Sequence, residues 1–290
     1  MELLVVLGRL VFSSFANVFQ KKLAHQGLHP FFIVMASYLV LSIICLPLLL
    51  ALTPSELSTN FWINIFFAAL LDMAGTLFLV MSLSKTDLSV FGPLNAYKVV
   101  ISMLLAIIFI GEIPNLQGFI GVGIIVLGSY FLFPASGHLN SSRLRYLLLE
   151  KGVQYRFLSI VLFSIGTLPL KQAVVLGDAL ATTVFWCLIG LPMAIIAHTV
   201  FLKDNFKRDL AQSKNSLSQF IYLGSLIFLM QYMTMIVFSQ LLIAYSLALF
   251  QLGMVLQVFL GYRIFNEKHI MRRLAASMVM IAGSLLVLKA

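Results

Sequence analysis

Hydrophobic residues fill the chain in long runs that short polar stretches interrupt. A helix needs about twenty apolar residues to cross the hydrocarbon core of a membrane. Runs of that kind predict ten membrane-spanning segments, near residues 3–21, 29–51, 61–83, 88–110, 115–134, 157–175, 179–201, 218–240, 244–264 and 270–288. The stretches between them, such as HQGLHP and NEKHIMRR, contain turn-forming or charged residues. The pattern therefore predicts an all-α polytopic membrane protein.

Composition supports the same class of protein. Of the 290 residues, 61% are hydrophobic and only 10% are charged, a balance that a water-soluble globular domain does not show. The formal net charge of +9 would suggest nucleic acid as the partner of a soluble protein. In a membrane protein, basic residues instead flank the spanning segments and fix their orientation. We therefore expect no nucleic-acid site.

The two halves of the chain resemble each other. A shift of 155 residues aligns Glu112 with Glu267 and Gly128 with Gly283, and a shift of 150 residues aligns Ser14 with Ser164 and Lys21 with Lys171. Each half contains five predicted segments, an odd number, so the second half enters the membrane from the opposite side. The sequence thus predicts two inverted five-helix repeats, residues 1–135 and 157–290, joined by a basic cytoplasmic linker at residues 136–156. Such repeats are typical of secondary transporters, whose sites lie near the midplane between the halves.

Basic residues gather on one side of this predicted topology. Fifteen of the nineteen lysines and arginines lie in or beside the connections after the odd-numbered segments. The opposite side has only Lys171 and Lys289, while Arg9 and Lys98 fall within segments. The positive-inside rule then places the odd-numbered connections in the cytoplasm and both termini outside. We expect a multi-pass protein of the cell (inner) membrane, surrounded by membrane lipids.

The end of each half carries a recognisable combination of residues. An apolar helix leads to a short acidic turn, Gly111-Glu112 or Asn266-Glu267, and a last helix with a Gly-Ser pair follows. Together with the two five-helix halves, this combination resembles the EamA-like branch of the drug/metabolite transporter superfamily. The resemblance implies a transporter in which the first four helices of each half enclose a central cavity. It also implies that the fifth and tenth helices lie at the periphery.

Three segments of the first half carry polar residues about one helical turn apart, so that each segment has one polar face. The residues are Arg9, Ser13 and Asn17 in the first segment, Asp72 and Thr76 in the third, and Asn95, Lys98 and Ser102 in the fourth. A charged side chain near the centre of a bilayer costs at least about 2.5 kcal/mol. These faces are therefore expected to line protein or a water-filled cavity.

The second half repeats this pattern with neutral residues. The 155-residue shift aligns Thr76 with Gln231, Lys98 with Gly253 and Ser102 with Gln257, and Tyr232 and Gln251 lie nearby. The predicted substrate site therefore combines a charged side from the first half with Gln231, Tyr232, Gln251 and Gln257 from the second. Such asymmetry suits a substrate with an ionic end and a less polar end.

Each charged residue also has a structural interpretation. Lys98 and Asp72 both lie near the middle of their segments, so they could form an ion pair, and Asp72 could pair with Arg9 instead. Arg9 could also extend to the membrane interface. Asn17 and Asn95 could donate hydrogen bonds between packed helices.

The sequence contains no Walker loop, no HExxH or GxSxG motif and no aspartate-rich cluster for Mg²⁺. We therefore expect neither an enzyme nor a metal or cofactor site. The expected function is secondary transport of a small anionic or zwitterionic metabolite by alternating access. A coupling proton and a counter-substrate stay open as energy sources, and so do a monomer and a homodimer. The alternatives are a flippase for an anionic lipid carrier and a non-transporting structural membrane subunit.

Overall fold

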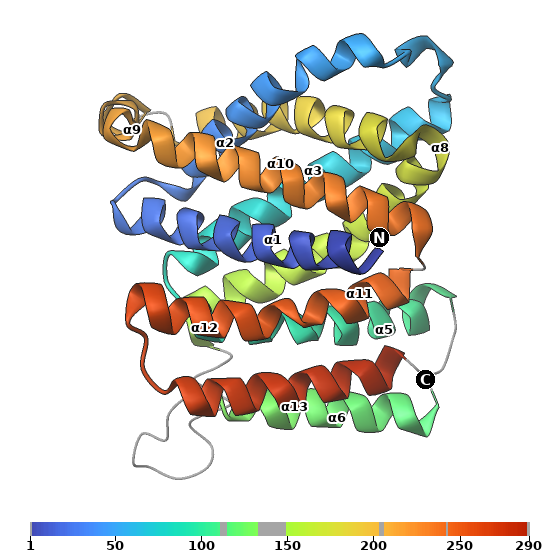
Figure 1. Ribbon diagram of the computed structural model, residues 1–290, viewed down its shortest axis with the longest axis vertical. Coiled ribbons are helices and arrows are strands. Elements are labelled where there is room, and N and C mark those ends of the chain that lie inside the picture. Colours follow the sequence, from blue (N-terminus) through green and yellow to red (C-terminus); the bar gives the residue numbers. More distant parts are fainter. Residues whose placement is uncertain (1, 111–114, 133–148, 203–205, 242, 289–290) are drawn as a thin grey trace.

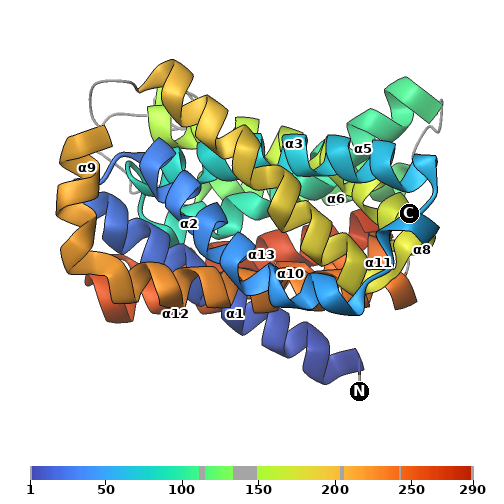
Figure 2. The same cartoon turned by 90° about the horizontal axis from the view of Figure 1, so that it is seen from above.

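The computed structural model describes residues 2–110, 115–132, 149–202, 206–241 and 243–288, and these residues form helices and no strand. The main helices are α1 (Glu2–His25), α2 (Pro30–Cys45), α3 (Thr59–Leu83), α4 (Leu88–Phe91), α5 (Tyr97–Ile110), α6 (Leu116–Tyr130), α8 (Lys151–Phe201), α9 (Phe206–Ser213), α10 (Leu217–Gln240), α11 (Ile243–Gln251), α12 (Gly253–Phe265) and α13 (Ile270–Leu288). The long helices run side by side along one common direction (Figure 1 and Figure 2). α1 begins and α13 ends on the same side of the bundle (Figure 1).

Seven helices of the described residues are long and apolar enough to cross a membrane. One of these is α8, whose 51 residues contain two predicted segments. Two further predicted segments correspond to apolar helices that are shorter than the other spans, Leu116–Tyr130 and Leu249–Phe265. Each predicted segment thus overlaps a helix or a pair of consecutive helices.

A single residue divides α8. Asp178 has φ 65° and ψ 176°, outside the helical region, and its Oδ1 accepts a hydrogen bond of 2.8 Å from the backbone N–H of Ala181. This is the arrangement of a helix N-cap, so a new helix begins after Asp178. A straight helix of this length would measure about 76 Å, more than twice the hydrocarbon thickness of a membrane. The break at Asp178 lets the chain fold back on itself (Figure 1).

Two other segments are interrupted near their middle. In residues 88–110, α4 ends before Pro93, a tight 3₁₀ turn covers Pro93–Ala96, and α5 then begins at Tyr97. Proline lacks the N–H that a helix interior requires, which accounts for the break. In residues 243–265, Leu252 separates α11 from α12. The interruptions end at Ala96 and Leu252, which are 156 residues apart, within one residue of the 155-residue spacing that relates the two halves of the sequence.

Helices from the two halves pack against each other. α1 packs along α10, α3 along α8, and α6 along α13. The α6–α13 contact forms one edge of the molecule (Figure 1), where Gly121 and Gly283 bring the backbones together. A Cβ atom added to either glycine would lie 2.8 Å from the carbonyl oxygen of the other. Small residues at such positions allow the close approach that packing in membranes uses.

Candidate functional site

A cavity of about 180 Å³ lies between α1, α2, α3, α8, α10 and the two interrupted segments. At roughly 15 Å³ for each water molecule, it has space for a small metabolite. In the described part of the chain, four charged side chains line it, namely Arg9, Asp72, Lys98 and Arg156. No described residue of α6 or α13 lines this cavity. The first four segments of each half therefore surround it, and the fifth and tenth lie outside.

The cavity gathers most of the residues that the polar faces predict. Its lining includes Arg9, Ser13, Asn17, Asp72, Thr76, Asn95, Lys98, Gln231, Gln251 and Gln257, but neither Ser102 nor Tyr232. Tyr232 follows Gln231 directly and is turned away by about 100° of helical rotation, and its ring stacks on Phe228. Ser102 lies in α5 one helical turn beyond Lys98, and the cavity lining on this helix includes Lys98 but not Ser102.

Lys98 is the second residue of α5, directly after the interruption of its segment. Its side chain is half-buried and lines the cavity. Within the described part of the chain, its amine has no hydrogen bond and no ion pair within 4.0 Å. It interacts electrostatically with Asp72, Arg9 and Arg156 across the cavity. Lys98 is therefore a cation without a fixed partner.

Asp72 is buried on α3 and has a different partner from the two that the sequence suggests. Its Oδ2 accepts a 3.0 Å hydrogen bond from Nε1 of Trp186 on α8. Neither Lys98 nor Arg9 forms an ion pair with it among the described residues. The close packing of Gly166 against its carboxylate explains why α8 can approach α3 at this point, because a Cβ there would lie 3.0 Å from Oδ1. The proposed Asp72–Lys98 ion pair is thus absent from this part of the structure.

Arg9 faces the cavity and does not extend to the end of α1. Its guanidinium lies 3.8 Å from the ring centroid of Phe250 on α11. Its Nε donates a 3.3 Å hydrogen bond to the hydroxyl of Thr234 on α10. An arginine held on an aromatic face keeps its charge available, because the ring contributes no negative charge of its own.

Arg156 is a cavity residue that sequence reasoning assigned to the cytoplasmic linker. α8 begins at Lys151, so the last residues of the predicted linker are helical. The Arg156 side chain is buried, donates a 2.9 Å hydrogen bond to Oδ1 of Asn95, and lies 4.0 Å from the ring centroid of Phe91. The repeat could have indicated this position, because it aligns Ser159 with Arg9, and Arg156 lies three residues, about one helical turn, before Ser159.

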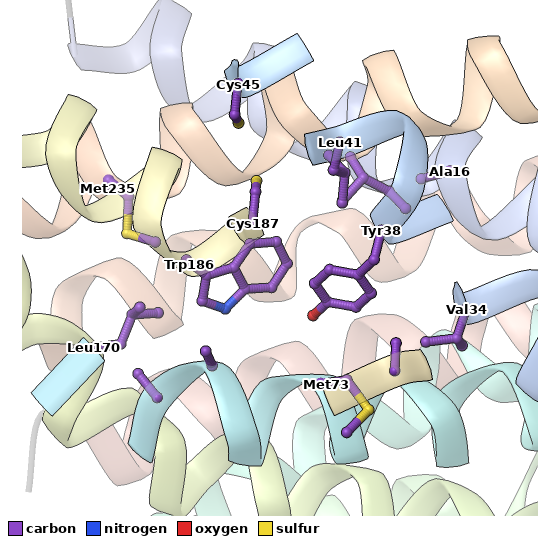
Figure 3. Packing of buried hydrophobic residues seen from close by; sticks show 14 of the residues in the cluster. Ala16, Val34, Tyr38, Leu41, Cys45, Met73, Leu170, Trp186, Cys187 and Met235 are labelled. Carbon is purple, nitrogen blue, oxygen red and sulfur yellow. The ribbon is translucent and has the colours of Figure 1, made fainter. Parts of the chain in front are cut away.

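The neutral side of the cavity combines aromatic and amide groups. Tyr38 of α2 and Trp186 of α8 lie next to each other, with ring centroids 5.3 Å apart, and continue into the apolar core (Figure 3). Gln251 accepts a 3.5 Å hydrogen bond from Asn95. Among the described residues, no partner is present for Nε2 of Gln251 or for Oε1 of Gln257. Buried polar groups rarely remain unpaired, so these amides are suited to contact a bound ligand.

A second cluster of charges lies outside the cavity, at the end of the bundle where α1 finishes. Nζ of Lys21 lies 3.0 Å from Oε1 of Glu267 and donates a 2.8 Å hydrogen bond to the carbonyl of Thr86. Arg273 contacts the other oxygen of Glu267 at 3.5 Å and Asp87 at 2.7 Å. The backbone N–H groups of Leu88 and Ser89 also donate to Glu267, at 2.7 and 2.8 Å, as does the Ser89 hydroxyl. We call Lys21, Asp87, Glu267 and Arg273 the end network.

These features define a helical multi-pass membrane protein with a polar internal cavity. Residues 1–133 match the model of the EamA-like transporter family, so the resemblance seen in the sequence is confirmed for this half of the chain. No curated protein matches the chain. A solved structure, described as the crystal structure of a protein, is similar over 98% of this chain and 94% of its own, with a TM-score of 0.64 and 12% identity. At that identity the likeness concerns the fold alone.

Proposed function

We propose that this protein is a secondary transporter that carries a small anionic or zwitterionic metabolite through the cavity by alternating access. The observation that carries the proposal is the unpaired amine of Lys98. Among the described residues, three cationic side chains and one carboxylate line the cavity, which leaves two positive charges in excess. Uncompensated charge inside a membrane is costly and typical of functional sites. A bound anion would compensate it, whereas a purely structural role would leave it without a partner.

Corresponding features of the two halves support an inverted repeat around the cavity. Lys21 donates to the carbonyl of Thr86, and Lys171 donates to the carbonyl of Leu241 at 3.1 Å. These two pairs match under the sequence shifts that relate the halves. The segments interrupted near Ala96 and Gln251 correspond as well. Discontinuous helices at equivalent positions of two repeats are a mark of substrate sites in transporters.

The end network suits alternating access because its ion pairs between the two halves lie at one end of the bundle. Lys21 and Asp87 belong to the first half, and Glu267 and Arg273 to the second. These contacts lie next to residues of the cavity, such as Gln20. For substrate to pass that end of the bundle, the contacts must separate. The network therefore acts as the closed gate of the state seen here.

The orientation that we propose follows from the basic residues. Connections rich in lysine and arginine lie at the end opposite to the start of α1 (Figure 1), and that end is assigned to the cytoplasm. A reporter that is active only in the cytoplasm should therefore be silent when fused after Ala290 and active when inserted beside Lys214. An active fusion after Ala290 would reverse the assignment.

Ligand stabilisation of the purified protein tests the substrate class. Thermal unfolding would be followed with carboxylates, phosphates, amino acids, amines and neutral sugars. We expect anions or zwitterions to raise the midpoint of wild type and not of Lys98→Gln, because the variant lacks the free cation. Lys85→Gln is the matched control, since Lys85 is exposed and outside the cavity. Stabilisation by the same anions in the Lys98→Gln variant would refute an anion site at this residue.

A further inference from the structure

The three cations of the cavity lie at different depths. Arg9 is seven residues after the start of α1 at Glu2, about 10 Å along the helix axis. Arg156 is five residues after the start of α8 at Lys151, about 8 Å along that axis. Lys98 lies near the middle of its segment, residues 88–110.

The two arginines approach the cavity from opposite ends. Thr86 bonds both to Lys21, close to the end of α1, and to Glu150, directly before α8. α8 therefore begins where α1 ends, as Figure 1 also shows. The order along the bundle is consequently Arg9, then Lys98, then Arg156.

The arginines are held in equivalent ways. Arg9 of the first half stacks on Phe250 of the second half, and Arg156 of the second half stacks on Phe91 of the first. Each phenylalanine lies within two residues of the interruption of its segment. The described hydrogen-bond acceptors of both guanidinium groups are neutral: the hydroxyl of Thr234 for Arg9, and the amide of Asn95 and the hydroxyl of Ser159 for Arg156. In both cases the aromatic ring and the neutral acceptors fix the plane of the guanidinium group without neutralising its charge.

Lys98 lies between the two arginines along the bundle and interacts electrostatically with both of them. Like charges repel strongly where water is excluded. Asp72, the one carboxylate in the described lining of the cavity, compensates a single charge. The remaining excess of two positive charges matches an anion with two negative charges. A row of cations also offers that anion successive positions along the cavity.

We propose that Arg9, Lys98 and Arg156 form an anion relay for a substrate whose ionic end carries two negative charges, as a phosphate monoester or a dicarboxylate does. Lys98 binds the anion at mid-depth in both inward-facing and outward-facing states. Arg9 receives it from the end where α1 begins, and Arg156 receives it from the other end. This inference rests on the proposed transport function and adds the charge of the substrate and the path it takes.

The fluorescence of Trp186, which lines the cavity, reports binding directly. The chain has two tryptophans, so a Trp62→Phe background leaves Trp186 as the single emitter. Inorganic phosphate and succinate would be titrated at mildly alkaline pH, with acetate as the monoanion of similar chemistry. We expect the dianions to bind at least about tenfold more tightly than acetate, equivalent to roughly 1.4 kcal/mol. Equal affinities for acetate and succinate would overturn the assignment of a dianion.

Exchange of the bound dianion in proteoliposomes of uniform orientation tests the relay itself. Arg9→Gln should lower the apparent affinity about tenfold from the face where α1 begins and have little effect from the other face. Arg156→Gln should show the reverse, and Lys98→Gln should lower the affinity from both faces. Arg9→Lys and Arg156→Lys keep the charge and should restore part of the loss, and they replace the glutamine variants where those fail to fold.

The outcomes separate the relay from the transport function. If each arginine variant weakens binding equally from both faces, the cations form one compact site and the relay is wrong, although anion transport stands. If Lys98→Gln binds dianions as wild type does, both proposals fail. Nanodiscs with and without phosphatidate identify the source of the charge. Displacement of phosphate by phosphatidate assigns the dianion to a lipid headgroup, and its absence assigns it to a soluble metabolite.

Discussion

Lys21 and Lys98 are both lysines inside the bundle, and their surroundings differ completely. The amine of Lys21 contacts a carboxylate and a backbone carbonyl, and its side chain is only 3% exposed. The amine of Lys98 has neither kind of partner in the described part of the chain and projects into a cavity with two further cations. The charge of Lys21 is compensated by its partners, whereas the charge of Lys98 adds to an excess of positive charge in the cavity.

The difference distinguishes charges with a structural role from charges available to a ligand inside a membrane protein. A buried charge is tolerated when its partners satisfy it, and the carboxylate of Glu267 receives bonds from Lys21, Arg273 and two backbone N–H groups. Such a set holds helices together. The cavity keeps its charge unsatisfied in the structure, which is the condition that a ligand can relieve. We therefore assign the end network to closure of the bundle and the cavity cations to the substrate.

Removal of Glu267 should have the largest effect on stability. Glu267→Gln leaves Lys21 buried without a carboxylate and leaves Arg273 with Asp87 as its carboxylate partner. Breaking a buried pair in this way costs about 3–5 kcal/mol. We expect a loss of that size in the free energy of unfolding, measured by chemical unfolding in mixed micelles. Glu56→Gln provides the matched control, since Glu56 is exposed and bonds only to Thr53.

The same measurement on Lys98→Gln makes the comparison quantitative. This variant removes one of three like charges and breaks no described hydrogen bond, so its stability should equal or exceed that of wild type. A loss as large as that of Glu267→Gln would contradict the division between a structural and a functional lysine.

Much of the fold could be predicted because membrane segments are encoded locally. The length of each apolar run fixes a span without reference to the rest of the chain, and each predicted segment overlaps helices of the structure. The polar faces were equally local. Arg9, Ser13 and Asn17 recur at helical spacing, and helical geometry alone places them together on the cavity.

What the sequence could not provide were contacts between distant segments. Lys21 and Glu267 lie 246 residues apart, and no spacing rule joins them. The hydrogen bond from Trp186 to Asp72 is of the same kind, and it replaces the expected partner of that carboxylate. Arg156 was missed for another reason: it stands at the end of a basic connection, where orientation alone accounts for a charge. Glu112, the repeat partner of Glu267, lies outside the described residues.

A smaller effect is expected for the pair at mid-depth, Asp72 and Lys98, and it provides the finest test of the comparison. The two side chains interact across the cavity without an ion pair within 4.0 Å. In a double-mutant cycle with Asp72→Asn and Lys98→Met, the coupling in unfolding free energy should therefore be about 1 kcal/mol or less. Asp72→Asn alone should lower the free energy of unfolding more than Lys98→Met does, because it weakens the bond from Trp186 and raises the positive excess of the cavity.

A coupling of about 3 kcal/mol would show that Asp72 and Lys98 hold the helices together as Lys21 and Glu267 do. Lys98 would then be a structural residue, and the difference between the two lysines would disappear.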